Sequence, residues 1–187
     1  MKIWTRQHPG VLEELERTGR YRVREEAIRL KNGDMSDYYL ELYRWYVRQG
    51  GRLVPVPEGV EYPVWVSLTT ESMLQPVEGS VVLELDVPDD LVLVTDVEKW
   101  GYRVNYWYIP KSPEDERRHN EELRRYGIAS ETALVQTDKG NFYPALKRKI
   151  VDSWDRLFDA PPADFSAAQG TVWELRREWL TRVVARG

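Results

Sequence analysis

The chain has 187 residues and a formal net charge of -4, with 42% hydrophobic and 31% charged residues. This length suits one domain with a real hydrophobic core. The mild acidity argues against general nucleic-acid binding, for which a strongly basic face is usual. The chain contains no cysteine, which excludes a disulfide scaffold, a thiolate nucleophile and a cysteine-type zinc site.

Neither a membrane nor a metal is an expected partner of this chain. No run approaches the roughly 18–20 apolar residues that a membrane span needs. The start of the chain, with Arg6 and Pro9, lacks the apolar segment of a secretory signal. The two histidines, His8 and His119, are far apart, and neither sits at a helical ligand spacing. These features and the lack of cysteine predict a cytoplasmic protein without a bound metal.

The pattern of apolar residues and turn signals predicts a mixture of strands and helices. In chain order the predicted elements are a strand over 3–7, helices over 9–18 and 36–49, strands over 62–68, 81–87 and 91–94, helices over 96–107, 112–126 and 144–158, and a tail over 171–186 with mixed signals. The strand over 81–87 is the clearest. Its apolar residues alternate with Glu84 and Asp86, which we place on a solvent face.

One predicted helix, within 111–127, carries almost only charged residues. Ser112 can cap it, Pro113 suits its first position, and acidic residues follow in the first turn. Such a helix must lie on the surface. We therefore expect His119 to be exposed and a poor candidate for a catalytic base.

The order of elements indicates the fold class. No linker is long enough to divide the chain, and strands do not alternate strictly with helices. We expect a single α+β domain over 1–187, with a split mixed or antiparallel sheet and flanking helices.

Tryptophan and tyrosine are unusually common, with eight and eleven residues against three phenylalanines. Three planar side chains, Tyr102, Asn105 and Trp107, crowd one segment. Asn105 offers both a donor and an acceptor, so this segment could wall a cleft for a planar ligand. The alternative is that the rings fill the core and the polar groups act as caps.

Arg20, Arg22 and Arg24 alternate as neighbours on one strand face would. Guanidinium donors match the oxygens of a phosphate or pyrophosphate, so this stretch could clamp such a group. The alternative is a surface on which these arginines pair with Glu25 and Glu26.

A carboxylate, Glu174, directly follows an indole, Trp173, near the end of the chain. A glutamate against an aromatic wall can have a perturbed pKa or stabilise a cationic transition state. The alternative is a surface or ion-paired Glu174, with Trp173 in the core.

Stretches spread over nearly the whole chain resemble a bacterial family of unknown function, catalogued under the number 3841. They are Ile3-Trp4-Thr5, Tyr62-Pro63-Val64-Trp65, Leu83-Glu84-Leu85-Asp86-Val87-Pro88, Asn105-x-Trp107-Tyr108, Ser153-Trp154-Asp155-Arg156-Leu157-Phe158-Asp159 and Val172-Trp173-Glu174-Leu175. This resemblance implies no particular activity.

The layout is more distantly similar to the ADP-ribosyltransferase superfamily, which implies an NAD cofactor and a sheet of that kind. Together with the arginine and aromatic segments, this similarity implies catalytic roles for Glu174 and Ser67, and NAD binding by Thr5, Arg6, Arg22, Trp65, Thr69, Tyr102, Asn105, Trp107 and Gln169. The chain departs from the superfamily pattern in two places. It has Ser67-Leu68-Thr69-Thr70 in place of a Ser-Thr-Ser triplet, and its Gln169 and Glu174 do not form a Gln-x-Glu pair.

The leading expectation is therefore an NAD-dependent ADP-ribosyltransferase that modifies a macromolecule, as a toxin or in phage defence. Two alternatives remain open. One is a non-catalytic module that binds a nucleotide or a protein through an aromatic cleft. The other is an oligomeric structural or regulatory protein whose aromatic surface is an interface.

Overall fold

The computed structural model describes residues 1–186, with side chains described for residues 1–184. The chain forms two compact units. The first comprises Met1–Val94 and the residues from Pro162 onward, and the second comprises Thr95–Pro161. Helices and antiparallel strands occur together, which confirms the mixed class of α and β structure. The expectation of one domain over 1–187 stays a prediction.

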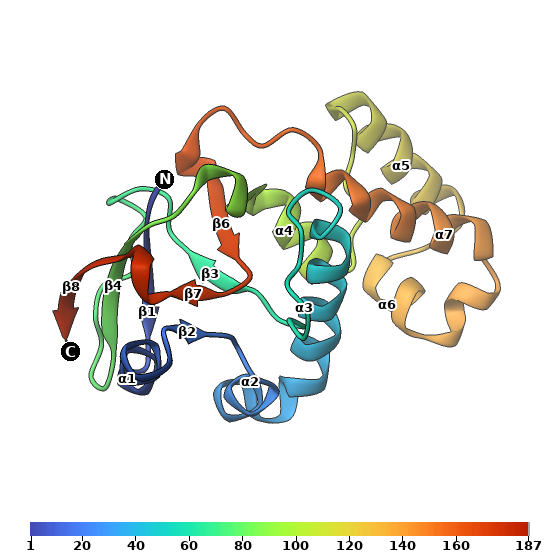
Figure 1. Ribbon diagram of the computed structural model, residues 1–187. Helices are drawn as coiled ribbons and strands as arrows, with labels where there is room; N and C mark the ends of the chain where they lie inside the picture. The colour runs from blue at the N-terminus through green and yellow to red at the C-terminus, as the bar shows by residue number, and fades with distance from the viewer. Residues whose placement is uncertain (187) are drawn as a thin grey trace. The chain divides into compact units, whose positions relative to one another are not determined.

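The first unit is built from helices α1–α3 and from the strands, of which β5 leads into the second unit (Figure 1). In chain order its elements are β1 (Lys2–Gln7), α1 (Pro9–Thr18), β2 (Arg20–Tyr21), α2 (Glu25–Asn32), α3 (Ser36–Gly50), β3 (Val64–Val66), β4 (Val81–Asp86), β5 (Leu93–Asp96), β6 (Ala168–Val172), β7 (Leu175–Arg176) and β8 (Leu180–Arg186). The predicted strands over 3–7 and 81–87 closely match β1 and β4, the one over 62–68 contains β3, and the one over 91–94 overlaps β5 only at Leu93 and Val94. The tail of mixed signals consists mainly of strands.

Strands β1, β4 and β8 form an antiparallel sheet with β4 in the centre (Figure 1). The register places Glu84 opposite Trp4 on one side and opposite Arg182 on the other. Trp4 Nε1 donates to Glu84 Oε2 over 3.1 Å, and Arg182 Nη2 donates to the same oxygen over 2.9 Å. Glu84 is consequently only 4% exposed. The expectation that it lies on a solvent face was wrong, because neighbours on both strands cover it.

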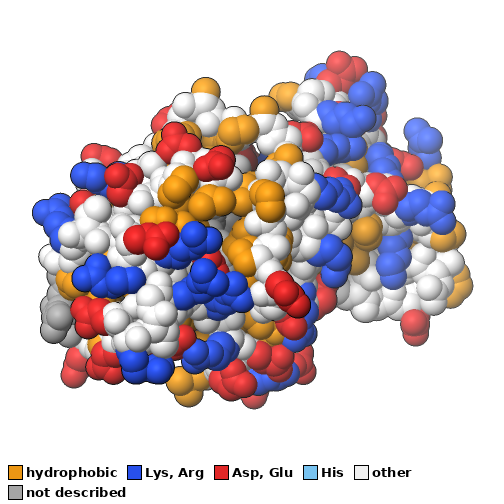
Figure 2. All heavy atoms as spheres, viewed as in Figure 1, with side chains coloured by type: hydrophobic (Ala, Val, Ile, Leu, Met, Phe, Trp, Pro, Cys, Tyr) orange, Lys and Arg blue, Asp and Glu red, His pale blue; other side chains and the backbone are white. Residues whose placement is uncertain are grey.

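Two smaller sheets complete the first unit. One has the order β3-β6-β5, and the other is the pair β2-β7. β3 and β6 are antiparallel, and an isolated bridge between Trp4 and Ser67 joins β1 to the end of β3. On the face shown in Figure 2, lysine and arginine side chains gather over the region of β2 and β7.

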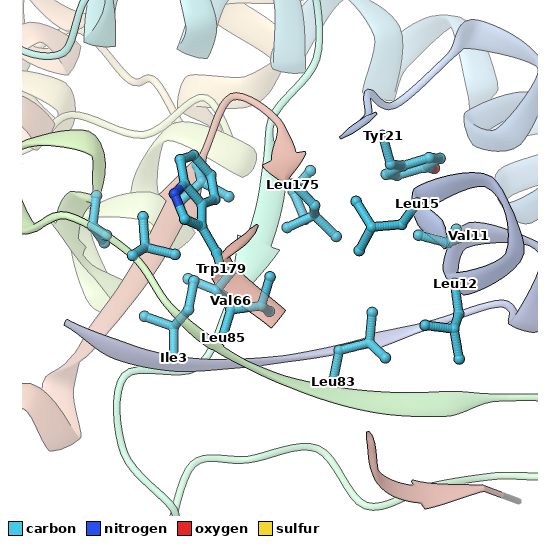
Figure 3. Close-up of a cluster of buried hydrophobic side chains, with 14 of the residues drawn as sticks. Ile3, Val11, Leu12, Leu15, Tyr21, Val66, Leu83, Leu85, Leu175 and Trp179 are labelled. Carbon is cyan, nitrogen blue, oxygen red and sulfur yellow. The ribbon is translucent and has the colours of Figure 1, made fainter. Parts of the chain in front are cut away.

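The core of the first unit joins the large sheet to α1 and to the strands that follow (Figure 3). Its members include Ile3, Val11, Leu12, Leu15, Tyr21, Val66, Leu83, Leu85, Leu175 and Trp179. Burial of each large aliphatic side chain contributes about 1.5–3 kcal/mol. Strands β1, β4 and β7 all contribute side chains to this cluster, so the core fixes the position of β7.

Helix α1 begins and ends where its sequence predicts. His8 Nδ1 accepts a hydrogen bond from the Gly10 amide over 3.1 Å, Pro9 occupies the first position, and Gly19 ends the helix with a φ of 79°. Helix α2 is absent from the prediction. It buries a single residue, Ile28, and one buried residue gives no apolar repeat from which a helix could be predicted.

The second unit is helical. Its helices are α4 (Val97–Val104), α5 (Pro113–Arg125), α6 (Glu131–Gln136) and α7 (Pro144–Ser153), and a 3-10 helix over Trp154–Phe158 continues α7. Helix α4 ends before Trp107, to which the prediction extended it. The reason is local: Tyr106 has a φ of 60°, a left-handed conformation that no α-helix contains. Helix α6 is absent from the prediction.

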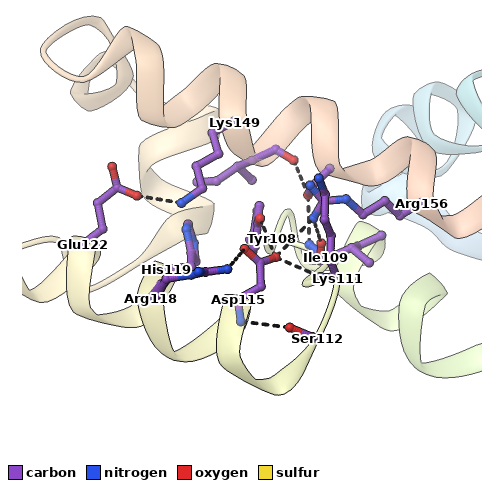
Figure 4. A network of polar contacts seen from close by, with 12 residues as sticks. Tyr108, Ile109, Lys111, Ser112, Asp115, Arg118, His119, Glu122, Lys149 and Arg156 are labelled. Atoms are coloured by element: carbon purple, nitrogen blue, oxygen red, sulfur yellow. Dashed lines mark hydrogen bonds and ion pairs between the residues drawn. The ribbon is translucent and has the colours of Figure 1, made fainter.

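Helix α5 is the predicted charged helix, and the Ser112 hydroxyl caps it by accepting from the Asp115 amide over 3.2 Å. His119 on this helix is only 2% exposed, so the expectation that it is exposed was wrong. Its ring stacks on Tyr108 with 4.1 Å between centroids (Figure 4), and its Nε2 lies 2.7 Å from Glu131 Oε1. A helix can thus be charged on most sides and still bury one of its polar side chains, here His119.

A polar network holds α5 against the segments around it (Figure 4). Asp115 Oδ2 accepts hydrogen bonds from the Lys111 amide over 2.9 Å and from the Tyr108 hydroxyl over 2.8 Å. These two hydrogen bonds lower the pKa of Asp115 below its ordinary value, and the bond from the Lys111 amide has the larger effect. Lys149 of α7 pairs with Glu122 of α5 over 2.7 Å. These contacts give Asp115 and Glu122 of α5 a structural role.

Candidate functional site

Glu174 lies between β6 and β7 and is only 3% exposed. Its two carboxylate oxygens bind different arginines. Oε2 accepts from Arg22 Nε over 2.9 Å, and Oε1 accepts from Arg176 Nε over 2.8 Å. Arg20 Nε lies 3.5 Å from Oε2. We refer to Glu174, Arg20, Arg22 and Arg176 as the Glu174 cluster.

The short β2–β7 ladder brings these arginines together. It pairs Arg20 with Arg176 and Tyr21 with Leu175. Tyr21 and Leu175 are buried in the core, so strand alternation directs the arginines to the other side of the ladder. Two cations directly opposite each other destabilise a strand pair. The carboxylate of Glu174 offsets that repulsion.

The cluster fixes the charge of Glu174. Burial would raise the pKa of this carboxyl, but the hydrogen bonds from Arg176 and Arg22 and the charge of Arg20 outweigh burial. The pKa of Glu174 is therefore lowered, and its side chain is an anion at neutral pH. The same contact raises the pKa of Arg176. Three guanidinium charges against one carboxylate leave the cluster positive.

The arginines keep donors for a further anion. Each guanidinium has five N–H donors, and the contacts with Glu174 use the Nε of each. Arg22 Nη1 also donates to the Glu58 carbonyl over 2.7 Å. Neither Nη atom of Arg20 donates a hydrogen bond to another of residues 1–184. The side chains of Arg20, Arg22 and Arg176 are 51%, 31% and 34% exposed, so solvent reaches them.

The arginines of the 20–24 stretch are ion-paired, but not with the carboxylates that the sequence suggested. Arg24 pairs with Glu14 of α1. Glu25 pairs with Arg29 at 2.7 Å and with Arg44 at 2.8 Å. Glu25 therefore pairs with arginines outside this stretch, whereas Arg20 and Arg22 converge on Glu174.

The tryptophans of the tail belong to the core rather than to an open wall. Trp173 is 4% exposed, and its Nε1 donates to the Val54 carbonyl over 2.9 Å. Trp179 is 7% exposed, and the Arg176 guanidinium lies 5.0 Å from its ring centroid. Both indoles thus follow the alternative interpretation, in which the aromatic rings fill the core, and Trp173 also has a hydrogen-bonded tip.

Three predicted site residues, Thr5, Trp65 and Ser67, meet where β1 joins β3. Thr5 Oγ1 donates to the Trp65 carbonyl over 2.9 Å, and the Ser67 amide donates to the Trp4 carbonyl over 2.8 Å. Ser67 Oγ itself donates to the Ser72 carbonyl over 2.9 Å. These bonds tie the two strands together and engage both hydroxyl groups.

Of the remaining predicted residues of the first unit, Arg6, Thr69 and the Trp65 ring have local partners. Arg6 Nη1 donates to the Gln75 carbonyl over 2.8 Å, and Thr69 Oγ1 bonds Ser72 Oγ over 3.1 Å. The Trp65 ring packs on two rings of α3, those of Tyr43 and Tyr46, at 5.7 and 5.0 Å between centroids. Gln169 Nε2 is buried, with no hydrogen-bond partner among the described residues.

Ser67 and Glu174 lie at opposite ends of the β3–β6 pair. The register runs from Val66 opposite Gly170 to Val64 opposite Val172. Ser67 follows the first of these pairs, whereas Glu174 follows the second. No hydrogen bond or ion pair joins Ser67 to Glu174 within residues 1–184. The two predicted catalytic residues thus belong to two separate places in the first unit.

Tyr102, Asn105 and Trp107 belong to the second unit. The rings of Tyr102 and Trp107 meet edge to face with 6.0 Å between centroids. Asn105 Nδ2 donates to the Gly101 carbonyl over 2.9 Å at the end of α4. Trp107 is 44% exposed and remains the open ring of this group.

Sequence reasoning selected Arg22 and Glu174 separately and missed Arg176. The signal for Arg176 was its position two residues after Glu174 in a strand-forming tail, which places both side chains on one face. That signal requires knowing that the tail is extended. Among the described residues, no group of three or more potential metal ligands gathers, and no helix is long and apolar enough to cross a bilayer.

Comparison with known proteins identifies a family. The family model described as a domain of unknown function, DUF3841, matches residues 2–181. The chain belongs to the DUF3841 family. No curated protein and no solved structure matches it. The DUF3841 region therefore includes the Glu174 cluster, β1 and the whole of the second unit.

Proposed function

We propose that this DUF3841 chain binds NAD, or a nucleotide with a similar pyrophosphate, at the Glu174 cluster and transfers its ADP-ribosyl group to a macromolecule. The observation that carries the proposal is the arrangement of Arg20, Arg22 and Arg176 around one buried carboxylate. The buried carboxylate holds guanidinium groups in place before any ligand arrives, which lowers the entropic cost of binding an anion.

The cluster fits the anionic part of a dinucleotide. Pyrophosphate oxygens accept the paired N–H donors of guanidinium groups well. The Nη atoms of Arg20 donate no hydrogen bond within residues 1–184, and its side chain is 51% exposed. Arg20 and Arg22 would hold the phosphates, and Arg176 would keep Glu174 in place.

The role of Glu174 follows from its charge. When bound, NAD supplies an ADP-ribosyl group and nicotinamide as the leaving group. An ionised carboxylate stabilises the positive charge that develops on the ribose as nicotinamide departs. The lowered pKa of Glu174 keeps it ionised at neutral pH. Ser67 is left out of this proposal, because it lies at the other end of the β3–β6 pair.

The first experiment tests binding. NAD is titrated into the protein up to millimolar concentration, and tryptophan fluorescence and heat are measured. Arg20→Gln should weaken binding roughly tenfold or more, since a hydrogen bond to a charged group contributes about 1.5–3 kcal/mol. Arg117→Gln is the matched control, because Arg117 is exposed on α5 of the second unit and is not part of the cluster. Absence of binding to the native protein would refute the proposal.

The second experiment separates an enzyme from a binding module. Release of nicotinamide is measured for the native protein and for Glu174→Gln, after circular dichroism has shown that the variant is folded. A transferase loses turnover in the variant even at NAD concentrations that saturate its weakened binding. If the native protein binds NAD and releases no nicotinamide with any cell extract as acceptor, the chain is a non-catalytic nucleotide-binding module.

A further inference from the structure

A hollow of about 430 Å³ opens beside the C-terminal half of α3. The loop that follows this helix forms its other side. The residues that matter for its chemistry are Arg44, Val47, Arg48, Val56, Val60 and Glu61. The hollow lies in the first unit and contains none of the Glu174 cluster.

The floor of the hollow is apolar. Val47 is 5% exposed, and Val56 and Val60 are half-buried. Gly51 lets the loop pack closely here, because a Cβ at this position would lie 2.8 Å from Val56 Cγ2 and 3.0 Å from the Val47 carbonyl oxygen. The absence of a side chain at Gly51 thus allows the loop to pack directly against α3.

The rim of the hollow is basic, and its arginines differ in their partners. Arg44 is neutralised by two carboxylates, Glu61 at 2.9 Å and Glu25 at 2.8 Å. Arg48, one turn further along α3, is exposed and has no hydrogen bond or ion pair with any residue of 1–184. One guanidinium is therefore available at the edge of an apolar floor.

We infer that this hollow binds a small amphiphilic carboxylate, with its apolar body on Val47, Val56 and Val60 and its carboxylate on Arg48. The volume lies in the range of about 300–1,000 Å³ that is common for small-molecule sites. A guanidinium can bind a carboxylate through two parallel hydrogen bonds. Glu61 and Glu25, already paired with Arg44, disfavour a ligand with several negative charges.

The experiment uses two probes with the same body and different heads, octanoate and 1-octanol. Binding to the full chain is measured by calorimetry and by chemical-shift changes of the valine methyl groups. Octanoate should bind saturably. Arg48→Ala should weaken octanoate at least about tenfold, as expected for loss of a hydrogen-bonded charge pair, and leave 1-octanol unchanged. The matched control Arg117→Ala should change neither.

A second variant tests the floor. Val60→Phe fills the hollow from a half-buried position and should weaken octanoate and 1-octanol together, while circular dichroism and thermal unfolding stay near those of the native protein. The inference is overturned if octanoate shows no saturable binding, if Arg48→Ala leaves its affinity unchanged, or if Val60→Phe, still folded, binds both probes normally. NAD binding at the Glu174 cluster is measured separately and does not enter these outcomes.

Discussion

Arg20 and Arg176 lie directly opposite each other in the β2–β7 ladder, and each directs its Nε toward the same carboxylate, that of Glu174. Glu174→Gln removes the charge and retains the shape of the side chain. We expect it to lower the free energy of unfolding by about 2–3 kcal/mol, less than the loss of a fully buried pair because the arginines stay partly hydrated. Urea unfolding measures this difference.

Glu178→Gln is the control for that prediction. Glu178 also approaches Arg176, with 3.6 Å between Oε1 and Nη1, but its side chain is 69% exposed. A surface ion pair contributes about 0–1 kcal/mol, so this variant should unfold nearly as the native protein does. Equal losses for Glu174→Gln and Glu178→Gln would contradict the central place of Glu174.

Stability should fall below about pH 4. The pKa of Glu174 is lowered in the folded protein, from an unfolded value of about 4.3. Such a group contributes stability that is fully present above the unfolded pKa and is lost as the pH falls through the folded pKa. The pKa of Glu84 is lowered too: burial opposes the change, and the bonds from Arg182 and Trp4 outweigh burial.

The free energy of unfolding should therefore change little above about pH 5 and fall below about pH 4. Urea unfolding at a series of pH values, followed by tryptophan fluorescence, measures this profile. Glu174→Gln should show a shallower acid loss than the native protein. Identical acid slopes would mean that Glu174 has an ordinary pKa in the folded state.

Trp4→Phe tests the buried bond between β1 and β4. The substitution retains an aromatic ring and removes the Nε1 donor, which lies 3.1 Å from Glu84 Oε2. A buried hydrogen bond to a charged group contributes about 1.5–3 kcal/mol, and thermal unfolding should report a loss of that order. Trp107→Phe, at a ring that is 44% exposed, should have a much smaller effect. A larger loss for Trp107→Phe would contradict this account.

Gly170→Ala tests the packing of β6. A Cβ at Gly170 would lie 2.6 Å from Leu68 Cδ2 and 2.7 Å from Val66 Cγ2. Such overpacking costs about 1–3 kcal/mol. Gly101→Ala is the comparison: nothing lies within 4 Å of its Cβ in helix α4, and alanine favours a helix over glycine by up to about 1 kcal/mol. Denaturant midpoints should move in opposite directions for the two variants.

The sequence allowed prediction wherever a local pattern determines the structure. Alternation over 81–87 predicted β4, and Pro9 with Gly19 marked the two ends of α1. Helix α2 lacks an apolar stripe. Helix α4 ends just before Tyr106, which adopts a left-handed conformation although it is not a glycine. Neither the presence of α2 nor the end of α4 is therefore predictable from a local sequence pattern.

The candidate site depended on contacts between distant residues. Arg22 and Glu174 are 152 positions apart, and no local pattern indicates which carboxylate an arginine will meet. The burial of His119 was missed for the same reason, because its cover comes from Tyr108 and Glu131. The sequence therefore indicated Arg22 and Glu174 as candidate residues, but it did not indicate that they contact each other.

The order of strands in the large sheet has a consequence during synthesis. β4 can pair with β1 as soon as residue 86 has been made, but its other neighbour, β8, begins at Leu180. At about 5–20 residues per second, one edge of β4 stays unpaired for several seconds while the second unit is made. An unpaired edge recruits strands from other chains. Chains truncated before Leu180 lack β8, so the edge of β4 stays unpaired, and we expect these chains to bind chaperones or to aggregate.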